Sequence, residues 1–379
     1  MRILHVVPTY WPAIRYGGPI YSVHGLCKGL VQLGHQVHVG TTSVDGPGDS
    51  DVPHGIPVDR DGVQVHYFRS PALRRLYWSP GLQRWLGTVM GGYDVVHLHS
   101  VFLWPTSMAA RLAVARSIPY VLSPRGTLVP ELILRKSALP KLAWIAAFEA
   151  RTLARASCVH WTSEHERRAA ERLPLLRLPE GFVVPNGIDL DEVPGDPQPS
   201  DAPYAVYLGR INWEKGIDRA IRAVRGTPIR LRIYGNDREN HVAYLQALAD
   251  ELGVASQVAF MGPVSGDAKW RALAGARLTV LPSLSENFGN VVVESMAVGV
   301  PVVATEGVGA ATVLRAAEAG RVCPGDEAAL RSAMLDLWDQ PQLARSLGDA
   351  GRDYVHQYLS WKAVARTMAA HYDLLVGSC

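Results

Sequence analysis

Residues 278–304 read LTVLPSLSENFGNVVVESMAVGVPVVA, and they contain a strand, a loop, a helix and a second strand in that order. The apolar runs Leu278–Leu281 and Pro301–Ala304 predict the two strands, and Asn290–Val298 has the length and composition of a helix. Because a helix joins the two strands, we expect them to run parallel. This order of elements predicts an α/β fold.

The same alternation of short apolar runs and longer amphipathic segments extends along the chain, which predicts two doubly wound, Rossmann-like domains. In the first half we expect strands at Arg2–Val7, Gln36–Thr41, Val63–Phe68, Val95–Leu98, Tyr120–Ser123, Cys158–Thr162 and Phe182–Pro185. The helices expected there are Ile20–Leu33, Ser107–Ser117 and a long segment from about Lys141 to Ala154. In the second half we expect strands at Ala205–Leu208, Arg230–Tyr234 and Val258–Phe260, and helices at Gly216–Val224, His241–Glu251 and Ala268–Leu273.

A proline-rich stretch, residues 189–204, separates these two sets of elements. Its composition cannot hold a regular helix or strand and is typical of a linker. We therefore predict a first domain at residues 1–190, a linker at 191–203 and a second domain at 204–359. Ligands of open α/β sheets bind at the carboxyl ends of the strands, so we expect the binding site in a cleft between the domains.

The composition excludes several classes of protein. Of 379 residues, 48% are hydrophobic and 19% are charged, which excludes a disordered chain. The longest uncharged run, residues 95–110, is shorter than the ~20 apolar residues that cross a bilayer, and Met1–Pro8 is too short for a signal peptide. Scattered cysteines without a C-x-x-C pair predict free thiols and a cytoplasmic protein rather than disulfides or a zinc site. They are Cys27, Cys158, Cys323 and Cys379.

The charge is small but unevenly distributed. A net charge of +3 does not indicate a nucleic-acid binder. Residues 1–185 carry 20 basic against 12 acidic residues, whereas residues 186–379 carry 18 against 23. Many basic residues between Arg69 and Arg172 alternate with large apolar side chains, which suits an anionic membrane surface or an acidic, lipid-linked substrate. Ordinary solvated arginines on helices are the alternative.

Two glutamates in the opening stretch predict a ligand site. Glu286 follows the expected strand, Gly289 permits close backbone approach, Asn290 can begin the helix, and Glu294 lies about one turn into it. The helix start offers N–H groups to an anion, and the carboxylates can accept hydrogen bonds from hydroxyl groups on either side. A diphosphate between two sugars has this pattern. A glutamate that only complements the helix dipole is the alternative.

Two further loops carry candidate groups. Arg210 and Lys215 follow the strand Ala205–Leu208 and can neutralise a diphosphate without a metal ion, unless Glu214 pairs with one of them in a plain surface turn. Gly17 and Gly18 follow the first strand and let backbone amides approach a ligand, which we expect to be the donor, although such pairs also occur in ordinary turns. Neither G-x-G-x-x-G nor a P-loop is present, which disfavours nicotinamide-dependent redox chemistry and P-loop phosphotransfer.

Taken together, these motifs resemble glycosyltransferase family 4, whose members are retaining enzymes of the GT-B fold that use nucleotide-diphosphate sugars. The resemblance covers nearly the whole chain in the right order, and only the combined set is specific. It comprises Gly17-Gly18, Gly34-His35, His97-x-His99, Asn186-Gly187-Ile188-Asp189, Gly209-Arg210, Lys215-Gly216, Gly262 after Phe260, and Glu286-x-Phe288-Gly289 with Glu294.

The resemblance implies a role for each matched residue. Glu286 would contact the donor sugar, Glu294 the ribose hydroxyls, and Arg210 and Lys215 the diphosphate leaving group. Gly262 and its neighbours would border the base, and the diphosphate would also receive backbone amides from Phe288, Gly289 and Asn290. Neither a metal nor another cofactor is implied. Retention by front-face substitution would need no carboxylate nucleophile.

The chain departs from the family pattern after the strand Tyr120–Ser123. Many relatives have a histidine there, whereas this chain has Ser123-Pro124-Arg125-Gly126, which resembles a subgroup of bacterial capsule and exopolysaccharide enzymes. Arg125 could approach the phosphates or the acceptor. His99 could reach the cleft or pack at its strand end, and a His97/His99 zinc pair is disfavoured because no third ligand stands nearby in the sequence.

The last segment has apolar residues at helical spacing from Tyr354 to Tyr372. The resemblance implies that a final helix, about residues 360–379, returns to pack on the first domain. We expect a cytoplasmic, metal-independent, retaining glycosyltransferase that takes a nucleotide sugar and extends a glycan, with a polyprenyl-diphosphate carrier and the inner membrane surface as partners. A nucleotide-sugar epimerase of the same fold and a non-catalytic sugar-nucleotide-binding protein are the alternatives.

Overall fold

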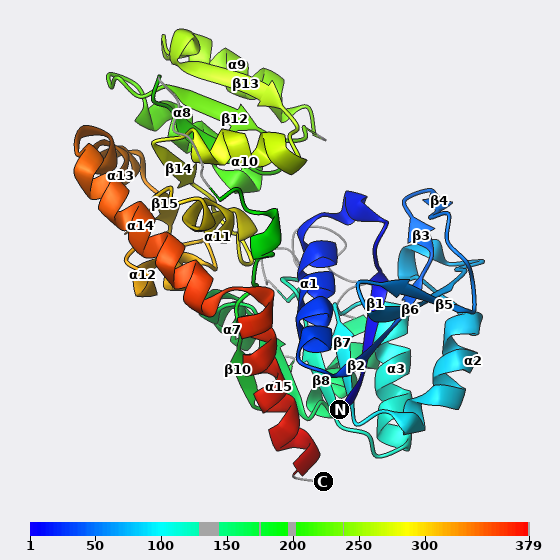
Figure 1. Ribbon diagram of the computed structural model, residues 1–379. Coiled ribbons are helices and arrows are strands. Elements are labelled where there is room, and N and C mark those ends of the chain that lie inside the picture. Colours follow the sequence, from blue (N-terminus) through cyan, green and yellow to red (C-terminus); the bar gives the residue numbers. More distant parts are fainter. Residues whose placement is uncertain (129–143, 174–175, 196–201, 238, 378–379) are drawn as a thin grey trace. The chain divides into compact units, whose positions relative to one another are not determined.

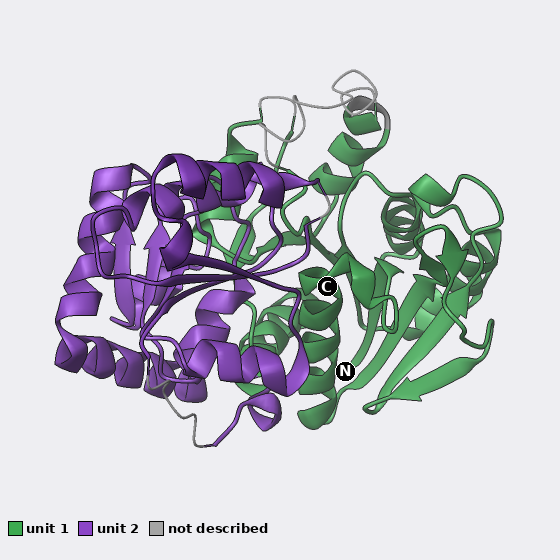
Figure 2. Cartoon of the chain, turned by 90° about the horizontal axis from the view of Figure 1, so that it is seen from above, with its two compact units in different colours: residues 1–187, 361–379 green, residues 188–360 purple. Residues whose placement is uncertain are grey.

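The computed structural model describes residues 1–128, 144–173, 176–195, 202–237 and 239–377. The chain divides into two compact units, which Figure 2 distinguishes by colour. Unit 1 comprises Met1–Gly187 with Trp361–Cys379, and unit 2 comprises Ile188–Ser360. Of the linker predicted at 191–203, residues 196–201 lie outside the described residues, and the boundary between the two units falls after Gly187.

Unit 1 contains an eight-stranded sheet in the order β10-β9-β8-β7-β1-β2-β6-β5 (Figure 1). All neighbours pair in parallel except β5, an antiparallel edge strand that the sequence analysis did not predict. The strands are β1 (Arg2–Thr9), β2 (Gln36–Thr42), β5 (Pro57–Arg60), β6 (Val63–Phe68), β7 (Val95–His99), β8 (Tyr120–Ser123), β9 (Cys158–Trp161) and β10 (Gly181–Val183). A hairpin of β3 (Val44–Asp45) and β4 (Gly48–Asp49) follows β2.

Successive side chains of a strand point to opposite faces of the sheet and therefore pack against different helices. In β1, Ile3 packs with helices α1 (Gly18–Gln32) and α15 (Trp361–Gly377), whereas Leu4 packs with α2 (Pro80–Val89) and α3 (Trp104–Ala115) on the other face. The remaining described helices are α6 (Ala150–Ala154), after a π-helical turn at Ile145–Glu149, and α7 (Glu164–Glu171). The first part of the helix predicted from Lys141, residues 141–143, lies outside the described residues.

Unit 2 contains a six-stranded parallel sheet in the order β13-β12-β11-β14-β15-β16. Its strands are β11 (Ala205–Leu208), β12 (Leu231–Tyr234), β13 (Val258–Gly262), β14 (Leu278–Leu281), β15 (Val302–Thr305) and β16 (Gly320–Cys323). Its helices are α8 (Ile217–Ala223), α9 (His241–Glu251), α10 (Gly266–Ala274), α11 (Asn290–Ala297), α12 (Ala311–Ala316), α13 (Glu327–Asp339) and α14 (Pro341–Tyr358). Two doubly wound α/β units, as predicted, are therefore confirmed.

The final helix expected at about residues 360–379 is α15, whereas Tyr354 and Tyr358 belong to the preceding helix α14. Helix α14 ends at Tyr358 and α15 begins at Trp361. The break arises because Leu359 and Ser360 pair with Ile188: its amide donates to the Leu359 carbonyl oxygen at 2.8 Å. Helix α15 then packs on α1 within unit 1, as the resemblance implied.

Small residues on α1 permit this contact. A Cβ atom added at Gly25 would lie 2.1 Å from the Trp361 ring, so α1 and α15 approach more closely than a larger residue would permit.

The three described cysteines, Cys27, Cys158 and Cys323, are buried free thiols, and burial raises the pKa of each to about 11 or 12. Within the described part of the chain, no helix is long and apolar enough to span a membrane.

Candidate functional site

The strand order of unit 2 identifies where a ligand is expected. From β11 the chain proceeds to β12 and β13 on one side, whereas β14, β15 and β16 lie on the other side. Strands β11 and β14 therefore flank the topological switch point, outside which doubly wound sheets bind their ligands. Arg210 and Lys215 follow the end of β11, and Glu286 follows the end of β14.

An ion pair joins the two loops at this switch point. The Lys215 Nζ donates a hydrogen bond to the Glu286 Oε2. The Lys215 side chain is only 7% exposed, whereas that of Glu286 is 24% exposed. We predict Glu286, Arg210 and Lys215 to be the catalytic residues, and the structure brings two of them into direct contact, with the carboxylate more exposed than the ammonium group.

The backbone explains why these loops meet. Gly216 has φ +58°, and a Cβ atom there would lie 2.2 Å from the carbonyl oxygen of Pro282. Only glycine permits both the left-handed conformation and this close approach. The Leu284 amide also donates to the Glu214 carbonyl oxygen at 2.9 Å, which joins the two loops directly beside the ion pair.

A second pair of backbone contacts holds Glu286 against the loop after β15. The Glu286 amide donates to the Gly307 carbonyl oxygen, and the Gly309 amide donates to the Glu286 carbonyl oxygen, both at 2.9 Å. Phe288 is 3% exposed and packs in the core of unit 2, so it anchors the loop. Gly289, with φ +89°, then leads into α11, which begins at Asn290 as predicted.

Glu294 belongs to a different ion pair. Its Oε1 lies 3.2 Å from the Nζ of Lys269, which projects from α10 and packs over the Trp270 ring. Sequence reasoning missed Lys269, because it adjoins no recognisable motif and meets Glu294 only through the packing of α10 on α11. The Glu294 side chain is 22% exposed and can still accept a hydrogen bond from a ligand.

Arg210, the third of the predicted catalytic residues, is exposed. Its carbonyl oxygen accepts a hydrogen bond from the Tyr207 hydroxyl at 2.7 Å. Burial raises the pKa of Tyr207, the charge of Glu286 raises it further, and the charge of Arg210 lowers it, so both charged groups lie near this phenol. Gly262 ends β13 with φ +75°, and its carbonyl oxygen accepts from the Gly235 amide at 2.9 Å.

In unit 1 the switch point lies between β1 and β7. Gly17, with φ +74°, caps α1, and Gly18 is the first residue of that helix. His99 ends β7 and is buried, as the packed alternative expected. Its Nε2 lies 2.9 Å from the Nδ1 of His5 in β1.

The argument that no third ligand accompanies His97 and His99 is wrong. His5 is in register with His97 on the neighbouring strand, and one ring nitrogen of each of the three histidines lies within 4.8 Å of the others. However, both ring nitrogens of His97 are engaged in hydrogen bonds. Burial lowers the pKa of all three imidazoles, the charge of Arg125 lowers it further, and that positive charge disfavours a metal cation.

Arg125 lies on the turn that follows β8. It is a non-glycine residue with φ +56°, and Gly126 follows with φ +79°. Its Nη1 donates to the Asn186 Oδ1 at 3.0 Å, whereas its Nε is buried without a hydrogen-bond partner. Among the described residues, no carboxylate lies within ion-pair distance of its guanidinium.

Comparisons with known proteins identify the class that this fold and site define. Residues 17–187 match the family model "Glycosyl transferase 4-like domain", and residues 192–354 match "Glycosyl transferases group 1". The chain is 30% identical to a D-inositol 3-phosphate glycosyltransferase of Acidothermus cellulolyticus, over 84% of this chain and 71% of that one. The protein is therefore a glycosyltransferase of the GT-B fold, and it belongs to glycosyltransferase family 4.

Two other similarities are informative. The chain is 28% identical to the phosphatidyl-myo-inositol mannosyltransferase of Mycobacterium leprae, over 87% of this chain and 86% of that one. The structure of Anabaena HepE in complex with UDP and glucose superposes with a TM-score of 0.72, over 99% of this chain and all of that one. Their sequence identity is 19%, so the likeness to HepE shows the shared fold.

Proposed function

We propose that this protein is a retaining, metal-independent glycosyltransferase that moves a sugar from a nucleotide-diphosphate sugar to a lipid-linked glycan during bacterial surface polysaccharide synthesis. The observation that carries the proposal is the Lys215–Glu286 pair between the ends of β11 and β14. This pair places a cation and a hydrogen-bond acceptor together where a doubly wound sheet binds its ligand.

The charges at this point suit a diphosphate leaving group. Arg210 and Lys215 supply two positive charges to a group that becomes more negative as the sugar–phosphate bond breaks. They can thereby do the work that a divalent metal does elsewhere. The Glu286 carboxylate, held through its own backbone, can accept hydrogen bonds from donor-sugar hydroxyls, and Glu294 can accept them from the ribose.

Retention would then follow from a front-face substitution. The bond from the anomeric carbon to the diphosphate oxygen breaks while the acceptor hydroxyl bonds to the same face of that carbon, and the leaving oxygen takes the acceptor's proton. Neither a covalent glycosyl-enzyme nor a carboxylate nucleophile is needed. The bound UDP and glucose of HepE favour a nucleotide sugar as donor. In this proposal Gly262 borders the base.

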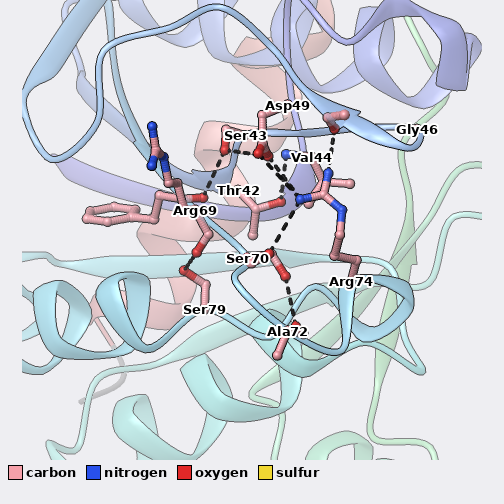
Figure 3. A network of polar contacts seen from close by, with 12 residues as sticks. Thr42, Ser43, Val44, Gly46, Asp49, Arg69, Ser70, Ala72, Arg74 and Ser79 are labelled. Carbon is pink, nitrogen blue, oxygen red and sulfur yellow. Dashed lines mark hydrogen bonds and ion pairs between the residues drawn. The ribbon is translucent and has the colours of Figure 1, made fainter.

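A surface segment of unit 1 supports a lipid-linked acceptor and peripheral binding at the cytoplasmic membrane face. Leu73 is 64% exposed between exposed Arg69 and Arg75. Figure 3 shows how this segment is fixed: Arg74 contacts the Asp49 carboxylate at 3.3 Å and the Ser70 carbonyl oxygen at 3.4 Å. The M. leprae relative is named for transfer to a phosphatidylinositol, which also favours a lipid acceptor.

An enzymatic assay in which the donor and the acceptor are added separately tests the proposal. Each of several nucleotide sugars is incubated with the protein, with and without a bacterial lipid extract, and release of the nucleoside diphosphate and the anomeric configuration of the product are measured. We expect release that depends on the extract and retention of configuration. A product formed without acceptor would instead indicate an epimerase, and binding without any turnover would indicate a non-catalytic protein.

A further inference from the structure

A row of buried polar side chains crosses unit 1 beneath α1 and α15. We call it the imidazole row, and its members are His5, His97, His99, Ser123, His160 and Tyr372, all buried. Burial lowers the pKa of His5 and His160 to about 3, and it lowers the pKa of His97 and His99 well below the ordinary value. At neutral pH each imidazole therefore has one N–H donor and one acceptor nitrogen.

The Val184 carbonyl group determines which atoms carry the protons in the series of hydrogen bonds from His160 to Tyr372. The His160 Nε2 lies 2.9 Å from the Val184 carbonyl oxygen, so Nε2 must be the protonated nitrogen. Its Nδ1 then accepts from the Ser123 hydroxyl at 2.7 Å, and the Ser123 oxygen accepts from the His97 Nε2 at 2.6 Å. The His97 Nδ1 accepts from the Tyr372 hydroxyl at 2.5 Å. The ring nitrogens of His97 and His160 and the Ser123 hydroxyl therefore all have hydrogen-bond partners.

The neighbouring His5–His99 pair, in contrast, lacks a hydrogen-bond partner for one nitrogen of each ring. Its two rings share one hydrogen bond, from the Nδ1 of His5 to the Nε2 of His99 or in the reverse direction. The other nitrogen of each ring is buried without a partner. For either direction of the shared bond, one N–H donor and one acceptor are left unsatisfied, which is costly inside a protein unless a ligand or water supplies the missing partner.

Arg125 adds an unpaired positive charge at the same place. Arg125 lies two residues after Ser123, which is in register with His99 and hydrogen-bonds both His97 and His160. Burial lowers the pKa of the four imidazoles, and the charge of Arg125 lowers it further. The nearby Glu166 carboxylate is already engaged, because it accepts from the Gly126 amide and from the amide and hydroxyl of Thr162. Arg125 also adopts a left-handed backbone conformation, and such strain in a non-glycine residue is characteristic of functional sites.

We propose that Arg125 and the His5–His99 pair form an oxyanion subsite in unit 1 that takes a phosphoryl or carboxylate group of the acceptor. The subsite lies at the β1/β7 switch point, where unit 1 should bind a ligand by the same rule that locates the donor site of unit 2. A guanidinium and an imidazole N–H are donors that suit such an anion. The assignment of the anion to the acceptor rests on the proposed function, in which the charged groups that hold the donor, Arg210, Lys215, Glu286 and Glu294, belong to unit 2.

Calorimetric titration of the full chain with inorganic phosphate tests this subsite. Saturating UDP is present, so that the diphosphate site of unit 2 is occupied. We expect phosphate to bind this complex, Arg125→Gln to weaken that binding at least tenfold, and Arg345→Gln, at an exposed residue of α14, to leave it unchanged. UDP itself should bind Arg125→Gln normally and Arg210→Gln more weakly.

Further titrations and a second Arg125 variant distinguish the possible outcomes. Acetate in place of phosphate distinguishes a carboxylate subsite from a phosphoryl one. Arg125→Lys retains the charge and should keep most of the affinity, which covers the case in which Arg125→Gln fails to fold. The subsite is refuted if phosphate does not bind, if both Arg125 variants bind it like the wild type, or if Arg125→Gln weakens UDP as strongly as Arg210→Gln. If UDP alone fails to bind, the donor assignment fails, and the phosphate titration without UDP still tests Arg125.

Discussion

The Tyr372 hydroxyl in the last helix donates a hydrogen bond to the Nδ1 of His97 in β7, across 275 positions of sequence. Both side chains are fully buried. Helix α15 is therefore joined to unit 1 by a specific polar contact in addition to its apolar packing on α1. Because the same His97 also contacts Ser123, this contact links the chain's end to the strand that precedes Arg125.

We expect Tyr372→Phe to lower the free energy of unfolding by about 1–3 kcal/mol, because the ring stays in place while the His97 Nδ1 loses its donor. Urea denaturation measures the change. Tyr358→Phe is the matched control, since Tyr358 is 51% exposed in α14 and should change stability by less than about 0.5 kcal/mol. Equal effects of the two substitutions would contradict a stabilising role for the buried hydrogen bond.

Apolar periodicity predicted the elements with strong patterns and missed those without them. The strand Ala205–Leu208 and the helix His241–Glu251 have the predicted bounds, because their buried residues form clear runs. The edge strand Pro57–Arg60 was not predicted, since none of its residues is fully buried. The start of the last helix was predicted at about residue 360, but the pairing with Ile188 that accompanies the break was not, because Ile188 is distant in sequence.

Gly216→Ala should destabilise the protein and abolish nucleotide-sugar binding. The new Cβ would clash with the Pro282 carbonyl oxygen and separate Lys215 from Glu286. Gly226→Ala is a matched control, because Gly226 also has φ +71° but has nothing within 4 Å of the added Cβ. The control should show only the cost of a left-handed alanine, about 1–2 kcal/mol, with normal binding. Thermal unfolding and calorimetry compare the two, and normal binding by Gly216→Ala would contradict the role of this close contact.

The candidate site was predictable to the extent that its residues follow one another in motifs. Lys215 and Glu286 were both predicted, but their direct contact was not, since it requires the two loops to meet beside Gly216. Lys269 was not predicted, because only helix packing brings it to Glu294. His5 was overlooked as a neighbour of His99, 94 positions away, because strand register cannot be read from spacing.

Arg210→Ala and Glu294→Ala should each weaken nucleotide-sugar binding, because each removes a charge-assisted contact worth about 1.5–3 kcal/mol. That energy corresponds to a roughly 10- to 150-fold higher Kd. Calorimetry with a nucleotide sugar measures the change, and Arg345→Ala, an exposed substitution on α14, serves as the control. The donor assignment would be refuted if both substitutions left the affinity equal to that of the control.

Stability should fall as the pH falls below about 6.5. His5 and His160, with pKa values lowered to about 3, are neutral in the folded protein, whereas the unfolded chain protonates them near the ordinary value of 6.5. The unfolded state therefore binds more protons in this range. Each such histidine should cost about 1.4 kcal/mol per pH unit once the unfolded chain is protonated. Urea denaturation between about pH 7.5 and 5 measures the slope.

Other titratable groups also affect how the free energy of unfolding changes with pH. The remaining histidines with lowered pKa values act in the same direction: His35, His38, His66, His97, His99 and His371. Burial raises the pKa of Glu149 and Glu166, which opposes the loss at lower pH. His160→Gln should make the slope shallower than that of the wild type. An unchanged slope would contradict a lowered pKa of His160 in the folded protein.

Membrane binding should depend on Leu73 and on salt. The side chain is 64% exposed, and its insertion into a bilayer would remove apolar surface from water, worth about 1.5–3 kcal/mol for a leucine. Arg69 and Arg75 would add about 1 kcal/mol each on an anionic surface. We therefore expect the protein to sediment with phosphatidylglycerol vesicles, to be released by high salt, and to bind at least tenfold more weakly as Leu73→Ser. Ile56→Ser, at a residue 58% exposed in the same unit, is the control and should bind normally. Equal binding by both variants, or binding to neutral vesicles as strong as to anionic ones, would show that this segment does not carry membrane association.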